Sequence, residues 1–82
     1  MFSKNLIESV NHLLNEGRKD SIRQVQSLMD KIELPEQMQE KYLLHVENIH
    51  QNFKRADIIQ FLVNKVKDLI RTDFNQVVKH PV

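Results

Sequence analysis

Helix-breaking residues are rare in this chain, which has one glycine and two prolines among its 82 residues. The glycine is Gly17, and the prolines are Pro35 and Pro81. Between these positions apolar residues recur every three or four positions, which is the period of an amphipathic helix. Because glycine and proline most often mark helix ends, this pattern predicts an all-α protein. We expect a small bundle of three to four helices.

The length predicts a single helical domain that spans residues 1–82, since domains commonly contain roughly 100–150 residues. A chain of this size buries only about 60% of the surface that its unfolded form exposes. Association with another chain would therefore add stability. We expect a protein partner, and the chain itself is a candidate homo-oligomer.

The first half of the chain is expected to form two helices that meet near Gly17. Ser3 is a suitable N-cap for the first helix, and Gly17 is a suitable C-cap because left-handed residues are common there. Ser21 and Gln24 have the spacing of a capping box, which predicts the start of the second helix. Pro35 ends that helix and suits the first position of the next one.

The stretch between Pro35 and Pro81 contains no glycine or proline, so residues 36–78 are either two helices or one long bent helix. The apolar residues form two faces, one of Met38, Tyr42, Val46, Ile49 and Phe53, and one of Ile59, Leu62, Val66, Leu69 and Ile70. These faces are rotated by roughly 130° from each other on one helical wheel. A straight helix cannot direct both at one core. We therefore expect a break or bend at residues 54–56, with Asp57 capping the last helix.

Residues that could carry catalysis or bind a metal are not grouped in the sequence. The histidines are His12, His45, His50 and His80. A helical metal site needs ligands four positions apart, but His45 and His50 are five apart. His12 and Glu16 have the correct spacing, yet one pair of ligands does not make a metal site. With no cysteine and one glycine, the chain also lacks thiolate ligands and a phosphate-binding loop. We expect no enzyme, no metal and no cofactor.

The charge balance gives no sign of nucleic-acid binding, because 12 basic residues face 11 acidic ones. Basic residues become more frequent toward the C-terminus, but Asp57, Asp68 and Asp73 are interleaved with them. Pairs such as Asp68 and Arg71 indicate a solvated helix face. We therefore expect no nucleic-acid partner. A small helical DNA-binding transcriptional regulator stays open as an alternative.

Two apolar residues lie away from the apolar faces of their own helices, which indicates either a wide core or a surface for a partner. They are Leu44 and Phe61, and basic residues follow Phe61 on the same helix. Aromatic and arginine side chains often dominate binding energy. The candidate partner-binding residues are Leu44, Phe61, Lys65, Lys67 and Arg71.

No segment of the sequence has the length of a membrane span. The most apolar stretch, residues 58–63, is interrupted by Gln60, whereas a spanning helix needs about 20 predominantly apolar residues. The N-terminal residues Met1–Asn5 also lack the apolar core of a signal peptide. We therefore expect a soluble, cytoplasmic protein.

The chain as a whole, from Met1–Ile7 through Asn75–Val82, resembles the small cytoplasmic lysis-inhibition proteins, or antiholins, of T-even bacteriophages. The resemblance is carried by the length and by the Asn-, Ile- and Lys-rich sequence rather than by a motif. It implies that the chain binds the cytoplasmic segment of a phage holin and delays lysis of the host. A helical protein of the bacteriocin-immunity type is a further alternative with the same general design.

Overall fold

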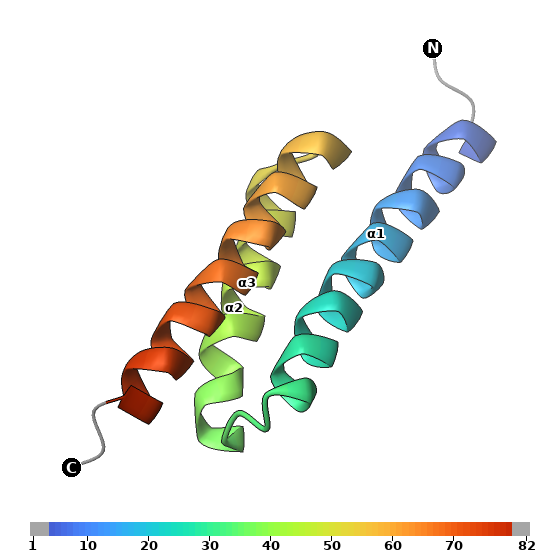
Figure 1. The fold of residues 1–82 in the computed structure, drawn as a ribbon. Helices are drawn as coiled ribbons and strands as arrows, with labels where there is room; N and C mark the ends of the chain where they lie inside the picture. The colour runs from blue at the N-terminus through green and yellow to red at the C-terminus, as the bar shows by residue number, and fades with distance from the viewer. Residues whose placement is uncertain (1–3, 80–82) are drawn as a thin grey trace.

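The computed structural model describes residues 4–79, which form three helices and no strand. Helix α1 spans Lys4–Lys31, α2 spans Glu36–Asn52 and α3 spans Ala56–Lys79. The chain runs down α1, back up α2 and down α3, and in this view α2 lies behind α3 (Figure 1). The expected all-α small bundle is confirmed.

Helix α1 continues through Gly17, so the expectation that two helices meet there is wrong. Gly17 does not have a positive φ, and the structure has open space where its Cβ would be. Ser21 does not start a new helix; its hydroxyl donates a hydrogen bond to the carbonyl of Gly17 at 3.1 Å. One interior glycine costs a helix about 1 kcal/mol. The burial of Val25 and Met29 farther along α1 outweighs this cost. The N-cap expected at Ser3 lies outside the described residues.

The C-terminus of α1 forms a Schellman motif in which the left-handed residue is Glu33, with φ of 56°. The backbone N–H of Leu34 donates to the carbonyl of Met29 at 2.9 Å, and that of Glu33 donates to Asp30 at 3.1 Å. A left-handed conformation costs a residue with a Cβ roughly 1–2 kcal/mol. The motif places Leu34 in the core, where it is 4% exposed. Burial of this leucine offsets the strain at Glu33.

The connection between α2 and α3 consists of Phe53, Lys54 and Arg55, one residue ahead of the expected position. The N–H of Phe53 donates to the carbonyl of Ile49 at 3.0 Å, and Phe53 itself is extended. Residues 36–79 are therefore two helices rather than one. Asp57 lies inside the first turn of α3 and not ahead of it, and its carboxylate accepts from the N–H of Ile58 at 2.9 Å. An acidic residue at this end is favoured by the helix dipole.

The core lies between the second half of α1, α2 and most of α3. Its buried apolar residues are Val25, Met29, Leu34, Tyr42, Val46, Ile59, Val63, Val66 and Ile70. Tyr42 is fully buried, and its hydroxyl donates to the Asp73 carboxylate at 2.5 Å. This bond satisfies the only polar atom of the tyrosine side chain and connects α2 to α3.

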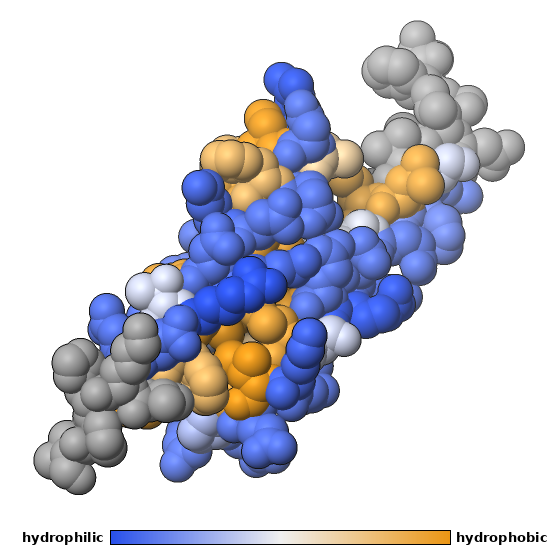
Figure 2. Space-filling view, in the orientation of Figure 1, coloured by the Kyte–Doolittle hydropathy of each residue, from blue (hydrophilic) through white to orange (hydrophobic). Residues whose placement is uncertain are grey.

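The first half of α1 extends beyond the turn that joins α2 to α3 (Figure 1). Helix α1 has 28 residues, whereas α2 has 17, and the molecule measures 60 × 19 × 16 Å. No described residue of α1 before Ser21 is buried. Apolar side chains remain exposed on this half of α1, at the upper right of Figure 2, and Leu13 is 69% exposed. Among the described side chains of α1, those that belong to the core therefore lie in its second half.

The strain at Glu33 leads to a first prediction. Replacement of Glu33 with glycine should raise the free energy of unfolding by about 0.5–1 kcal/mol, because glycine adopts positive φ without a steric cost. The matched control is Glu40→Gly, an exposed position inside α2, which should lower stability by about 1 kcal/mol. Urea unfolding followed by circular dichroism measures both changes. A loss of stability in Glu33→Gly would contradict the left-handed turn.

The course of α1 through Gly17 leads to a second prediction. Gly17→Ala should stabilise the protein by up to about 1 kcal/mol, since a Cβ meets open space and alanine favours the helix. Ser27→Ala, an exposed change in the same helix, should give a smaller gain. If Gly17 ended a helix in a left-handed conformation, alanine would instead destabilise the protein. The sign of the change in urea midpoint distinguishes the two structures.

Candidate functional site

Helix α3 carries a strip of apolar side chains beside its core face. We call Ile58, Phe61, Leu62, Lys65 and Leu69 the outer strip of α3. These residues recur every three or four positions and therefore lie along one side of the helix. Phe61 is 59% exposed and Leu69 is 39% exposed, while Ile58 and Leu62 are half-buried. None of the four apolar residues belongs to the core cluster. An exposed apolar strip of this kind is typical of a protein-binding surface.

Within the outer strip, a lysine lies over an aromatic ring. The Nζ of Lys65 is 5.1 Å from the centre of the Phe61 ring, a distance that allows a cation–π interaction. Both side chains are exposed, so the interaction contributes only about 0.5–1 kcal/mol. It nevertheless places a positive charge directly beside the largest exposed apolar side chain of the helix. A partner could contact both groups at once.

The other three residues that the sequence suggested for partner binding do not lie beside Phe61 and Lys65. Lys67 lies on the side of α3 that faces α1, and its Nζ donates to Gln24 Oε1 at 2.7 Å. Arg71 lies about 15 Å along the helix from Phe61 and is 3.4 Å from Asp68 in an ion pair. Leu44 is 60% exposed and lies on the outer side of α2. The structure therefore joins Phe61 with Lys65 and separates the remaining three.

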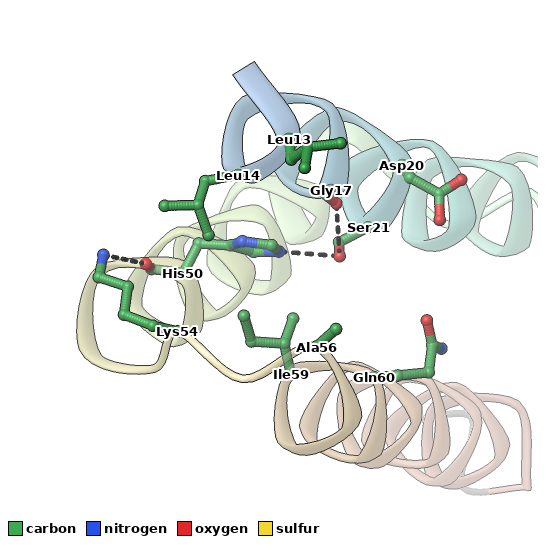
Figure 3. A pocket seen from close by; sticks show the side chains of 10 residues that line it. All are labelled: Leu13, Leu14, Gly17, Asp20, Ser21, His50, Lys54, Ala56, Ile59 and Gln60. Atoms are coloured by element: carbon green, nitrogen blue, oxygen red, sulfur yellow. Dashed lines mark hydrogen bonds between the residues drawn. The ribbon is translucent and has the colours of Figure 1, made fainter. Parts of the chain in front are cut away.

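A small cavity lies at the end of the bundle where α2 meets α3 (Figure 3). Its volume is about 180 Å³. The residues that line it are Leu13, Leu14, Gly17, Asp20 and Ser21 of α1, His50 and Lys54 near the end of α2, and Ala56, Ile59 and Gln60 of α3. The cavity therefore combines apolar walls from α1 and α3 with a few polar groups. It lies beside the middle of α1, where this helix begins to extend beyond the turn that joins α2 to α3.

The polar contact in this cavity joins Ser21 to His50, whose Oγ and Nε2 atoms are 2.8 Å apart. The Ser21 side chain is buried and its hydroxyl hydrogen is directed to the Gly17 carbonyl. A hydroxyl has one hydrogen, so Ser21 accepts from His50, which carries its proton on Nε2. Nucleophile activation requires the reverse, with the imidazole accepting from the serine. This geometry therefore supports a contact between α1 and α2.

Burial lowers the pKa of His50 below its ordinary value, and the positive charges of Arg18 and Lys54 act in the same direction. The Glu47 carboxylate opposes them, but it is itself paired with Arg18 at 2.6 Å. The imidazole is therefore neutral near pH 7. Neither Ser21 nor His50 was assigned this role from the sequence, because the two residues are 29 positions apart. In the sequence, the only indication of this contact is that each of the two residues lies close to the apolar face of its helix.

Among the residues that the structure describes, no group of three or more His, Asp or Glu side chains is placed to hold a metal ion. Within the same range, none of the helices combines the length and apolar character that crossing a membrane requires.

Comparison of the chain with models of known families gives no match. Comparison with curated proteins and with solved structures likewise gives no similar protein.

The environment of His50 leads to a third prediction. Because its pKa is lower in the folded chain, the unfolded chain takes up this proton at a higher pH. The stability that it contributes is complete above about pH 6.5 and declines as the pH falls through the folded pKa. His50→Gln, which keeps an N–H donor for Ser21, should reduce this loss below about pH 6.5. Urea unfolding at a series of pH values measures the difference, and a pH profile of His50→Gln equal to that of the wild type would contradict it.

Proposed function

We propose that this chain is a non-enzymatic protein-binding module that acts as an antiholin in the cytoplasm of the host. In this role it binds the cytoplasmic segment of a phage holin and delays lysis, and it works as a homo-oligomer. The observation that carries the proposal is the outer strip of α3, with Phe61 exposed and Lys65 over its ring. Exposed aromatic anchors next to a positive charge are typical of surfaces that bind other proteins.

The outer strip suits an amphipathic helix as its partner. Phe61 and Leu69 are eight positions apart, which corresponds to about 12 Å along α3. A partner helix lying along α3 would contact both side chains with apolar residues spaced by about two turns. Lys65 lies between them, so an acidic residue of the partner would face it. The proposed target is therefore an amphipathic, partly acidic segment of the holin outside the membrane.

The contacts that the basic residues of α3 already make within the chain favour a protein partner over DNA. A DNA-binding helix needs a row of free Lys and Arg side chains directed at phosphates. Here Lys67 is hydrogen-bonded to Gln24, and Arg71 is paired with Asp68. Arg55 at the start of the helix is likewise paired with Asp57 at 2.7 Å. Each pair would have to break before its basic side chain could contact a phosphate.

The proposal leads to a fourth prediction, which concerns the timing of lysis. Cells that produce the holin together with this protein should lyse later than cells that produce the holin alone. Phe61→Ser should raise the dissociation constant for the holin segment about 10- to 100-fold and shorten the delay, because it removes the central apolar anchor. Val77→Ser, an equally exposed apolar position on the same helix outside the strip, should leave the delay unchanged.

The charge beside Phe61 is tested by the same assay with its own control. Lys65→Glu should weaken holin binding, because it reverses the positive charge over the Phe61 ring, whereas Arg71→Glu, which lies outside the outer strip and is paired with Asp68, should not. Both positions are exposed, so helicity measured by circular dichroism should be almost unchanged. Identical lysis times with and without the protein, together with no binding of the holin segment, would refute the antiholin function. DNA binding that weakens steeply with salt would then support the regulator.

A further inference from the structure

The cavity where α2 meets α3 is lined by residues of all three helices. Leu14 of α1 and Ile59 of α3 belong to its apolar walls, and Ser21 and His50 form a polar wall (Figure 3). Ser21 is 3% exposed, and its hydroxyl oxygen is held 2.8 Å from His50 Nε2. A hollow with mostly apolar walls and a few fixed polar groups is the usual design of a small-molecule site.

Gly17 leaves room in this cavity on the side of α1. It lies one turn from both Leu13 and Ser21, which also line the cavity, so a side chain at position 17 would project into the same space. A Cβ at this position would meet no atom of the described residues within 4 Å. No close approach of another helix therefore requires the glycine, although a glycine inside a helix lowers its stability. The effect of Gly17 on the structure is the space that it leaves in the cavity wall.

The polar wall offers hydrogen-bond acceptors to a ligand. The hydroxyl hydrogen of Ser21 is directed to the Gly17 carbonyl at 3.1 Å, and the N–H of His50 is directed to Ser21 Oγ. A hydroxyl oxygen has two lone pairs, and His50 occupies one of them. The buried Ser21 oxygen can therefore accept one more hydrogen bond. A ligand that donates a hydrogen bond suits this wall, whereas a ligand that only accepts does not.

The polar residues at the edge of the cavity also favour a donor. The Asp20 carboxylate is an acceptor, and the amide N–H groups of Gln60 already donate to Gln24 and Asn64 at 3.0 Å each. The ammonium group of Lys54 is exposed and donates to a backbone carbonyl near the end of α2 at 3.3 Å. A ligand inside the cavity thus meets acceptors on the polar wall and meets the lysine at the solvent-exposed edge.

The volume of the cavity limits the size of the ligand to about one aromatic ring. The cavity measures about 180 Å³. An apolar protein cavity of about 150 Å³ accommodates benzene. Sites for larger, drug-sized ligands have volumes of about 300–1,000 Å³. A nucleotide or a fatty acid is therefore too large for this site.

We propose that the cavity binds a small aromatic molecule with one hydrogen-bond donor, of the size and chemistry of phenol. The ring lies between Leu14 of α1 and Ile59 of α3, and the donor is directed to Ser21 Oγ. Such a ligand contacts all three helices at the end of the bundle where α1 extends beyond the other two. The site does not depend on the antiholin function, and it is formed by other residues than the outer strip of α3.

Our fifth prediction concerns the binding of phenol to the full chain near pH 7, followed through the backbone amide signals in NMR spectra. Phenol should shift the signals of Gly17, Ser21 and Ile59 with a dissociation constant of about 1–10 mM, because one ring and one hydrogen bond support only weak binding. The signal of Met38, at the opposite end of α2, should stay in place.

Toluene tests the hydrogen bond, since it has the shape of phenol with a methyl group in place of the hydroxyl. Ser21→Ala should weaken phenol binding relative to toluene binding about 3- to 10-fold, because it removes the acceptor. The ratio of the two affinities cancels any change in the shape of the cavity. Ser27→Ala, an exposed change on the same helix, should leave the ratio as it is in the wild type.

A larger side chain at Gly17 tests the location of the site. Gly17→Leu should raise the dissociation constant for phenol at least about 10-fold, because the leucine occupies the space that the ring needs. Ser27→Leu adds the same side chain to an exposed position of α1 and should leave binding unchanged. Leucine favours a helix over either residue, so both variants should remain folded in circular dichroism.

Four outcomes would overturn the site. One is the absence of any shift at about 20 mM phenol. Another is a set of shifts centred on Phe61, which would place the ligand on the outer strip instead. The third is an equal loss of binding in Gly17→Leu and Ser27→Leu. The last is a ratio of phenol to toluene affinity that Ser21→Ala does not change. If Ser21→Ala does not fold, the wild-type shifts and the two leucine variants decide.

Discussion

Burial of Leu34 at the end of α1 decides how the three helices meet. Its position after the left-handed Glu33 turns the chain back, so that α2 begins at Glu36 alongside the second half of α1. The side chain of Gln39 reinforces the turn by donating to the Leu34 carbonyl at 3.0 Å. With α1 fixed at this end, a shorter α2 covers only part of its length. The first half of α1 protrudes at the opposite end as a direct result of that mismatch.

The sequence predicts helices well here because helical periodicity is a local property. The change of phase between the apolar faces around Val46 and Ile59 predicts an interruption at residues 54–56, and in the structure α2 ends at Asn52 and α3 begins at Ala56. The helix ends within the first half of the chain depend on tertiary packing and were missed. Gly17 is a common type of helix end, yet the continuous apolar face carries α1 through it. Glu33 is an unusual left-handed residue, and only the burial of Leu34 explains its conformation.

In the candidate sites too, features set within one helix were predictable from the sequence, whereas contacts between helices were not. The exposure of Phe61 follows from its phase within α3, and the sequence identified it for that reason. The fixed position of Lys67 depends on Gln24, which is 43 positions away, and no local pattern reveals it. The contact of Ser21 with His50 also joins distant helices. Residues that act within one helix could be predicted, whereas residues that join two helices required the structure.

Helix α3 divides its surface between the bundle and the solvent. Gln60 and Lys67 mark the side of α3 that faces α1, and both bond to Gln24. Phe61 and Lys65 instead contact each other within α3, and both side chains are exposed. A side chain that bonds to another helix is held by that helix, whereas an exposed side chain can meet another molecule without breaking a contact inside the bundle. The outer strip of α3 is therefore the part of this helix that a partner reaches at the lowest cost to the fold.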